Sequence, residues 1–295
     1  MFSGVFTALI TPFRDDKIDY DALGKILEMQ IQAGVDGVVP MGTTGESPTV
    51  SFEEHKEFIK RVVRIVNKRA RVVAGTGANS TEEAICLTRA AEEDGVDGAL
   101  LVNPYYNKPP QRGLVAHFES IAKSVSIPLI IYNIPGRTAI NFEPESIREL
   151  LEKTSNITAI KEASGDVTQM MRVIELCGER LTLLSGDDNL LLPVLSIGGK
   201  GVISVLSNFL PSDVMNIITL FKKGKIDEAR KAFYKLLPLS RAMFLETNPI
   251  PVKAAMEMLG YCSSSVRLPL MPLTDEKRER LKGSLIDYGV ELCLK

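Results

Sequence analysis

The sequence predicts an α/β fold: a closed (β/α)8 TIM barrel with a C-terminal helical appendage. Short β-branched, apolar runs recur eight times, amphipathic segments separate them, and the runs stop after about residue 224. Strand followed by helix, repeated at spacings of roughly 20–35 residues, is typical of a parallel sheet covered by helices. The chain has 295 residues, 45% of them hydrophobic, which is enough apolar surface for one large barrel and an appendage.

The predicted strands and helices alternate up to residue 224. The strand runs are residues 4–10, 37–40, 71–75, 98–102, 128–133, 157–162, 181–185 and 201–205. The helix-like stretches between them include residues 20–33, 52–66, 81–93, 111–124 and 168–177. Eight such units favour a closed barrel over an open, doubly wound sheet. No GxGxxG sequence follows the first strand, which weakens the alternative of a dinucleotide-binding fold.

Polar and glycine residues mark the predicted helix ends. Ser51 and Ser80 precede acidic first turns, as N-capping residues do. Gly34, Gly95 and Gly178 follow helical stretches, where a residue in the left-handed conformation is expected.

The last part of the chain is predicted to be helical. Residues 225–246, 251–259 and 274–288 have helical patterns, and Pro249 and Pro251 interrupt the chain between the first two. We therefore expect a catalytic barrel over residues 1–224 and a three-helix region over residues 225–295. Without a flexible linker between them, the two parts are expected to pack together.

Composition excludes several classes of function. Lys and Arg number 35 against 37 Asp and Glu, so no overall basic charge attracts nucleic acid. The four cysteines are widely scattered, which argues against a zinc site and a disulfide scaffold and fits a reducing cytoplasm. The N-terminal residues lack the pattern of a signal peptide, and no apolar run has the length of a membrane helix. A cytoplasmic protein without membrane or nucleic-acid partners is expected.

Lys161 is an amine inside the sixth apolar run. The period of a strand places it on one face with Ile157, Ala159 and Ala163. Burial of a lone ammonium is costly, so such lysines lower their pKa or acquire a counter-charge. A lysine that is partly neutral near pH 7 can attack a carbonyl and form a Schiff base. Alternatively, the stem packs in the core while the ammonium reaches solvent or pairs with Glu162.

Polar segments follow several predicted strands, at the barrel end where active sites lie. Residues 42–47 (GTTGES) place Thr43 and Thr44 after the second strand, where they either wrap a carboxylate or form an ordinary capping loop. Residues 103–110 (NPYYNKPP) follow the fourth strand. Their prolines stiffen a lid or subunit-contact loop, or Tyr105 and Tyr106 are simply packing residues.

The fifth and seventh strands end in further candidates. Tyr132 has the parity of an interior position and could relay a proton, and Arg137 just beyond it could hold a carboxylate or form a surface salt bridge. Gly186 and two carboxylates follow the seventh strand. A lysine, a tyrosine, two threonines and an arginine at one barrel mouth fit a Schiff-base reaction on a 2-oxo acid. We expect no metal site and no cofactor, because neither fingerprint occurs in the sequence.

Seven segments, spread over nearly the whole chain, resemble the dihydrodipicolinate synthase family. In order, they are residues 42–47, 104–109, 132–137, 160–163, 184–188, 201–205 and 248–253. The wider superfamily includes N-acetylneuraminate lyase and 2-keto-3-deoxygluconate aldolases, so a lyase or aldolase for a 2-oxo sugar acid is the alternative activity. Arg137 favours the synthase, because a sugar acid needs hydroxyl-binding groups at that place.

The resemblance implies a lyase that condenses pyruvate with L-aspartate 4-semialdehyde, giving 4-hydroxy-tetrahydrodipicolinate in the diaminopimelate route to lysine. It implies that Lys161 forms the Schiff base and that Tyr132, Thr43 and Tyr106 relay protons. Thr44 would bind the pyruvate carboxylate, with Gly186 and the backbone of Ile203 nearby, and Arg137 would orient the semialdehyde. The family's usual assembly is a homotetramer, a dimer of dimers, in which Tyr106 reaches the neighbouring subunit's site.

The resemblance also implies a regulatory site. In members that lysine inhibits, the effector lies among residues that correspond to Ser47, His55, Asn79, Glu83 and Tyr105. Phe52 replaces a frequent histidine there and Pro48 a common alanine. Because a phenyl ring cannot hydrogen-bond lysine, we expect weak or absent feedback.

Overall fold

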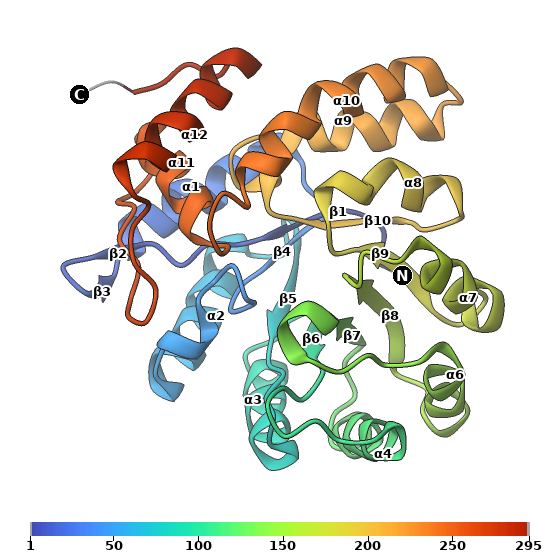
Figure 1. The fold of residues 1–295 in the computed structure, drawn as a ribbon. Helices are drawn as coiled ribbons and strands as arrows, with labels where there is room; N and C mark the ends of the chain where they lie inside the picture. Colours follow the sequence, from blue (N-terminus) through green and yellow to red (C-terminus); the bar gives the residue numbers. More distant parts are fainter. Residues whose placement is uncertain (1, 294–295) are drawn as a thin grey trace.

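The computed structural model describes residues 2–293 and contains the predicted (β/α)8 barrel (Figure 1). Its strands are β1 (Gly4–Ala8), β4 (Gly37–Val39), β5 (Arg71–Gly75), β6 (Gly98–Val102), β7 (Leu129–Asn133), β8 (Ile157–Glu162), β9 (Thr182–Ser185) and β10 (Gly201–Ser204). Consecutive strands pair in parallel, and β10 pairs with β1 to close the sheet. The closed barrel confirms the predicted fold class.

Helices surround the barrel and continue beyond it. Those that alternate with the strands are α1 (Tyr20–Ala33), α2 (Phe52–Val66), α3 (Thr81–Glu93), α4 (Gln111–Ala122), α5 (Pro135–Thr138), α6 (Pro144–Lys153), α7 (Val167–Cys177), α8 (Leu191–Ser196) and α9 (Pro211–Lys222). The later helices are α10 (Ile226–Ala242), α11 (Ile250–Met258) and α12 (Asp275–Tyr288). A small antiparallel hairpin, β2 (Phe13–Arg14) and β3 (Lys17–Ile18), lies outside the barrel between β1 and α1.

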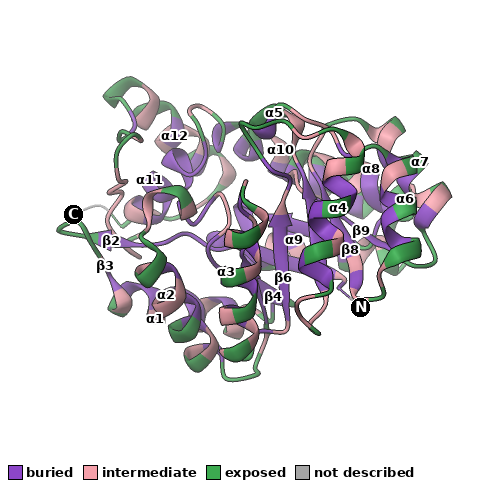
Figure 2. Ribbon diagram, turned by 90° about the horizontal axis from the view of Figure 1, so that it is seen from below, coloured by how far each residue is buried: buried purple, intermediate pink, exposed green. Residues whose placement is uncertain are grey.

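Apolar side chains fill the barrel interior, and glycine permits its closure. Every strand of the barrel contributes a buried side chain to one cluster: Phe6, Val39, Val73, Leu100, Ile130, Ala159, Leu184 and Ile203. On β10, a Cβ at Gly201 would lie 2.0 Å from the carbonyl oxygen of Gly4 on β1, so only glycine fits this seam. Figure 2 shows the buried strands at the centre and exposed residues on the outer faces of the helices.

The predicted inward face of β8 is partly wrong. Ala159 lies in the interior cluster as expected, but Ile157 packs outside the barrel, against the helices. The cause is a shift of register between β7 and β8: Leu129 pairs with Ile157, and the next residue, Ile130, pairs with Ala159. The extra residue changes the face of Ile157.

The helix-end predictions are mostly confirmed. Ser51 and Glu54 form a reciprocal capping box at the start of α2, and the side chain of Ser80 caps α3. Gly34 and Gly95 are left-handed, with φ of 80° and 84°. The prediction for Gly178 is wrong, because its φ is −57°. A Cβ there would lie 2.4 Å from the carbonyl oxygen of Ile174, so close packing requires this glycine.

The C-terminal helices pack on the barrel, as predicted. Val252 and Met256 of α11 and Leu281 of α12 belong to the same buried cluster as Leu9 and Met41, which follow β1 and β4. Figure 1 shows α11 and α12 beside α1, which comes near the beginning of the sequence. The division of the chain at residues 224 and 225 stays a prediction.

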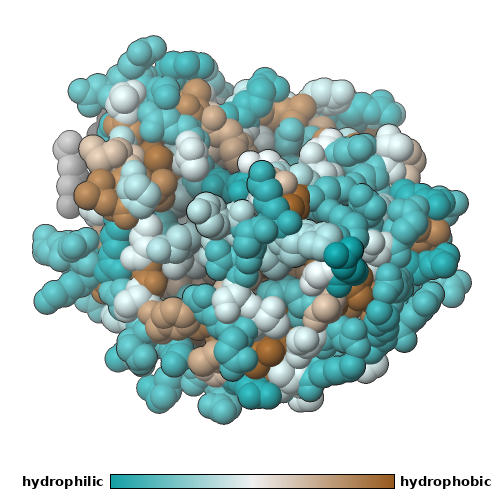
Figure 3. Space-filling view, turned by 60° about the horizontal axis from the view of Figure 1, so that its bottom comes forward, coloured by the Kyte–Doolittle hydropathy of each residue, from teal (hydrophilic) through white to brown (hydrophobic). Residues whose placement is uncertain are grey.

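The face in Figure 3 is mostly hydrophilic, with small groups of hydrophobic side chains between the polar ones. None of the helices within residues 2–293 combines the length and the apolar character that crossing a bilayer requires.

A buried ion pair joins α11 to the loop after β4. The Lys253 ammonium lies 2.5 Å from the carboxylate of Glu46, and both side chains are 0% exposed. The second Glu46 oxygen accepts a hydrogen bond from the backbone N–H of Arg267, and the Phe13 ring lies 4.2 Å from the Lys253 nitrogen. Burial lowers the pKa of Lys253, while the charge of Glu46 opposes that change.

We predict that Lys253→Met destabilises the fold strongly, because it leaves the Glu46 carboxylate buried without its cation. The expected loss is about 3–5 kcal/mol in the free energy of unfolding, measured by denaturant titration. The double variant Glu46→Gln/Lys253→Met should recover part of the loss, since no uncompensated charge remains.

Lys153 provides the matched control, because its ion pair with Glu149 is 42% and 51% exposed. Lys153→Met should change the free energy of unfolding by less than about 1 kcal/mol. Equal losses for the two lysine variants would contradict the prediction.

Candidate functional site

Lys161 and Tyr132 lie side by side at the carboxyl end of the barrel. The two residues are paired neighbours on β8 and β7. Lys161 is 6% exposed, and its Nζ lies 4.2 Å from the centre of the Tyr132 ring. At this distance the ammonium is attracted to the face of the ring, and the phenol is held next to the amine. The interior parity predicted for Tyr132 is confirmed, since the residue belongs to the interior cluster.

Glu162 faces away from Lys161, so the alternative pairing of the two is wrong. One oxygen of its fully buried carboxylate accepts hydrogen bonds from the amides of Asn133 and Gln169, at 3.0 and 3.1 Å. The other oxygen accepts from the backbone N–H of Ser164 at 2.7 Å. These neutral donors hold the end of β8 from outside the barrel and leave Lys161 inside it.

The loop after β9 lies against Lys161. A Cβ on Gly186 would be 3.1 Å from Cε of Lys161 and 2.5 Å from Cβ of Ala163, so glycine is needed for this approach.

Two carboxylates follow Gly186 in this loop. Burial raises the pKa values of Asp187 and Asp188, and the positive charge of Lys161 opposes both shifts. Asp188 also accepts hydrogen bonds from the backbone N–H groups of Val205 and Leu206, both at 3.0 Å.

The loop after β4 is a tight turn that carries both threonines. Backbone hydrogen bonds run from Gly45 to Gly42 and from Glu46 to Thr43, at 3.0 and 3.1 Å. Thr44 is buried, and its hydroxyl oxygen accepts a hydrogen bond of 3.0 Å from the side-chain amide of Asn248. Thr43 is half-buried beside it. The threonines therefore lie in a compact polar turn, and the residue that caps α2 is Ser51.

Arg137 lies on the short helix α5, directly after β7. Its guanidinium donates a hydrogen bond of 3.1 Å to the backbone carbonyl of Asn248, rather than forming the surface salt bridge considered above. Ile203 lies within β10, buried in the barrel interior.

Tyr106 stands apart from these residues. It is 90% exposed, has φ of 72°, and makes no hydrogen bond or ring contact within the described residues, whereas Tyr105 is 38% exposed. The loop is held at its base, where the Asn107 amide donates to the backbone carbonyl of Asn79 at 2.8 Å. Within one chain, therefore, Tyr106 does not join Lys161 and Tyr132.

The proposed regulatory residues occupy varied environments. His55 is buried, and one ring nitrogen contacts the backbone carbonyl of Gly75 at 2.9 Å. Burial lowers the pKa of His55 to about 4, so the ring is neutral near pH 7. The pKa of Tyr105 is raised by burial and by the charge of Glu83. Ser47 is half-buried, and Phe52 is 47% exposed.

Sequence reasoning missed several residues that shape this site. The sequence marks Asn248 and Lys253 only as part of the segment 248–253 that resembles the family, and it gives no signal for the amide groups around Glu162. No local pattern marks Asn248 and Lys253, because their partners Thr44 and Glu46 lie 204 and 207 positions away.

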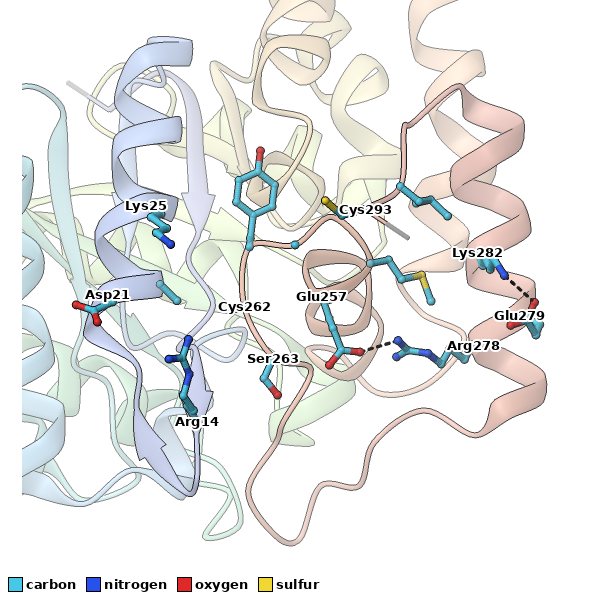
Figure 4. A pocket seen from close by; sticks show the side chains of 15 residues that line it. Arg14, Asp21, Lys25, Glu257, Cys262, Ser263, Arg278, Glu279, Lys282 and Cys293 are labelled. Atoms are coloured by element: carbon cyan, nitrogen blue, oxygen red, sulfur yellow. Dashed lines mark hydrogen bonds and ion pairs between the residues drawn. The ribbon is translucent and has the colours of Figure 1, made fainter. Parts of the chain in front are cut away.

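A separate cleft of about 670 Å³ lies between α1 and the C-terminal helices (Figure 4). Arg14, Lys25 and Lys282 line it, and the ion pair between Glu257 and Arg278, 2.6 Å long, lies at its side. It shares no residue with the group around Lys161.

Comparisons with known proteins identify the family of this chain. The model of the dihydrodipicolinate synthetase family matches residues 1–287. A 4-hydroxy-tetrahydrodipicolinate synthase from Leptospira biflexa is 57% identical over 275 residues, which cover 93% of each chain. One from Endomicrobium trichonymphae is 52% identical over 98% of this chain and 99% of that protein.

Solved structures extend the likeness to the fold. Dihydrodipicolinate synthase from Aquifex aeolicus has a TM-score of 0.98 at 44% identity, covering 99% of this chain and 100% of that one. The 4-hydroxy-tetrahydrodipicolinate synthase from Methylacidiphilum fumariolicum has a TM-score of 0.96 at 48% identity, covering 98% of this chain and 96% of that one. With both its fold and its sequence matching over nearly the whole chain, the protein belongs to the dihydrodipicolinate synthetase family.

Proposed function

We propose that this chain is a 4-hydroxy-tetrahydrodipicolinate synthase, which condenses pyruvate with L-aspartate 4-semialdehyde through a Schiff base on Lys161. The observation that carries the proposal is the contact between the Lys161 amine and the Tyr132 ring, 4.2 Å apart inside the mouth of the barrel. An amine can form an imine with a ketone when a group nearby can transfer protons, and the Tyr132 phenol is a candidate for that group. The curated relatives with this name cover nearly the whole chain.

The first half of the reaction takes place on pyruvate. The neutral amine of Lys161 attacks the ketone carbon, and the oxygen leaves as water after two proton transfers, which gives an iminium. Loss of a proton from the methyl group then gives an enamine. Tyr132 lies next to the nitrogen and is suited to move these protons, and Thr43 and Tyr106 complete the relay in our proposal.

The second half joins the two substrates. The enamine carbon attacks the aldehyde carbon of the semialdehyde, whose oxygen is protonated to a hydroxyl. The amino group of the semialdehyde then attacks the iminium carbon and displaces Lys161, which closes the ring and frees the amine. One water is released in total. This sequence needs no metal ion and no redox cofactor.

Two carboxylates must be held during these steps. Thr44, buried in the turn after β4, is proposed to bind the pyruvate carboxylate, with Gly186 and the backbone of Ile203 nearby. The Arg137 guanidinium, beside the same mouth, is proposed to orient the semialdehyde. Arginine suits this task because it donates two parallel hydrogen bonds to a carboxylate.

The exposure of Tyr106 supports a shared site. A phenol that is 90% exposed in one chain is available to a second copy, and its left-handed backbone points to a constrained loop. We propose a homotetramer built as a dimer of dimers, with Tyr106 completing the partner's site. The cytoplasmic location stays a prediction from the sequence.

We predict that borohydride traps pyruvate on Lys161. Reduction of the iminium should leave a stable secondary amine on the peptide that contains Lys161, detected by mass spectrometry. Lys161→Met should abolish the adduct and lower kcat by roughly 10³-fold or more. As a matched control, Lys200→Met, at the opposite end of the barrel, should keep both.

An adduct on another lysine, or none, would refute the proposed mechanism. Turnover of N-acetylneuraminate or 2-keto-3-deoxygluconate faster than of the semialdehyde would refute the proposed substrate.

A second prediction concerns Tyr106. Lys161→Met and Tyr106→Ala should each be nearly inactive, yet oligomers formed from a mixture should regain up to about a quarter of wild-type activity. In a mixed dimer, one site contains both the lysine of its own chain and the tyrosine of the other.

Mixing Lys161→Met with Tyr132→Phe should restore nothing, because both residues act within one chain. Failure of the first mixture to recover activity, with mixed oligomers present, would place Tyr106 outside the partner's site.

A third prediction concerns feedback. Turnover should persist at sub-millimolar lysine, because Phe52 offers no hydrogen bond and one ring nitrogen of His55 is engaged by Gly75. Phe52→His should increase sensitivity to lysine. Strong inhibition of the unmodified protein at sub-millimolar lysine would overturn the expectation.

A further inference from the structure

Asn248 contacts both residues that are proposed to hold substrate carboxylates. It lies just before α11, in the connection from α10, and is 6% exposed. Its side-chain amide donates to the hydroxyl oxygen of Thr44 at 3.0 Å. Its backbone carbonyl accepts from the guanidinium of Arg137 at 3.1 Å. One residue from outside the barrel therefore joins two groups on different barrel loops.

The direction of the hydrogen bond to Thr44 determines what that hydroxyl can do. A hydroxyl has one proton to donate and an oxygen that accepts. Because the Asn248 amide donates to the oxygen, the proton of Thr44 remains available to another acceptor. A carboxylate is an acceptor without a proton, so the amide prepares Thr44 to bind an anion.

The side-chain oxygen of Asn248 also indicates that the amide N–H group is the part of this residue that matters for Thr44. The side-chain oxygen of Asn248 is buried and has no hydrogen-bond partner within the described residues. A buried acceptor without a partner costs free energy, which an apolar side chain would avoid. The N–H donor of the amide accounts for an asparagine at this place.

The buried ion pair holds Asn248 in position. Lys253 follows Asn248 on α11, and Glu46 follows Thr44 in the loop after β4, so the ion pair and the amide contact join the same two segments. The backbone N–H of Lys253 also donates to the carbonyl of Pro249 at 3.0 Å, which places the ion pair in the first turn of α11. The ion pair therefore keeps the start of α11, and with it Asn248, close to the loop that carries Thr44.

The contact with Arg137 restrains a flexible side chain. Within residues 2–293 the Arg137 guanidinium, which carries five N–H donors, makes one hydrogen bond. The remaining donors are available to a substrate carboxylate, and the tether reduces the conformational entropy lost when that substrate binds.

We infer that Asn248 is a positioning residue for both carboxylate subsites, directing the Thr44 hydroxyl toward pyruvate through its side chain and Arg137 toward the second substrate through its backbone. The inference rests on the proposed function. It makes the C-terminal region part of the active site, although that region supplies no group proposed to react.

Asn248→Asp separates the two contacts. The carboxylate has nearly the same shape, but it accepts the Thr44 proton instead of donating, and it repels an anion. The KM for pyruvate should rise roughly tenfold to a hundredfold, and borohydride trapping at low pyruvate should slow equally. The KM for the semialdehyde should change less than threefold, because the backbone carbonyl remains.

A double-variant comparison tests whether Asn248 acts through Thr44. Asn248→Ala and Thr44→Val should each raise the KM for pyruvate, and the two together should raise it no more than Thr44→Val alone. Additive effects would show that Asn248 acts independently and would overturn the inference.

Gln32→Glu is the matched control, since it makes the same change from amide to carboxylate on an exposed face of α1. It should keep the wild-type KM for both substrates. Thermal unfolding of each variant shows whether it is folded. If Asn248→Ala does not fold, the isosteric Asn248→Asp still decides between the outcomes.

Different results would contradict the proposed function and the role of Asn248. If the wild-type chain forms no pyruvate adduct on Lys161, the proposed function is wrong. If the wild-type chain forms the adduct and folded Asn248→Asp keeps the wild-type KM for pyruvate, only the role of Asn248 is wrong.

Discussion

The buried ion pair between Glu46 and Lys253 constrains the arrangement of the loops and helices at the carboxyl end of the barrel. Two opposite charges that are fully removed from water cannot separate without a large penalty, so the loop after β4 and helix α11 must stay together. This constraint places α11 against the loop after β4, at the carboxyl end of the barrel, and keeps Asn248 against Thr44. The loop that carries Thr43 and Thr44 is consequently held from two directions, by its own turn and by a helix that lies far along the chain.

The filled barrel explains the position of the Lys161 amine. Apolar side chains from all eight strands occupy the interior, so a polar group on an inward-facing position is tolerated only near the end of a strand. Lys161 is such a group, and it is accommodated by the Tyr132 ring on one side and by the absence of a side chain at Gly186 on the other. The adjacent Glu162 has the opposite parity. Its charge is satisfied by amides outside the barrel, so it does not neutralise Lys161 by direct pairing.

Most residues of the proposed site are buried in a single chain, but one of them is on the surface. Thr44, Tyr132 and Lys161 are all buried, whereas Tyr106 projects into solvent. The shared site that we propose accounts for this difference, because the exposed phenol of one copy would enter the mouth of the next. If the site is shared in this way, catalysis depends on assembly of the subunits.

The sequence by itself determined the barrel, the inward position of Lys161 and Tyr132 and most of the helix caps, because these depend on local periodicity and on neighbouring residues. Only the tertiary structure decided the face of Ile157, which depends on a register shift between two strands. It also decided the partner of Arg137, the orientation of Glu162 and the role of glycine at position 178. The pairs Asn248–Thr44 and Lys253–Glu46 are separated by 204 and 207 positions. Contacts over such distances arise from the packing of the complete chain, and no local pattern encodes which polar group will meet which.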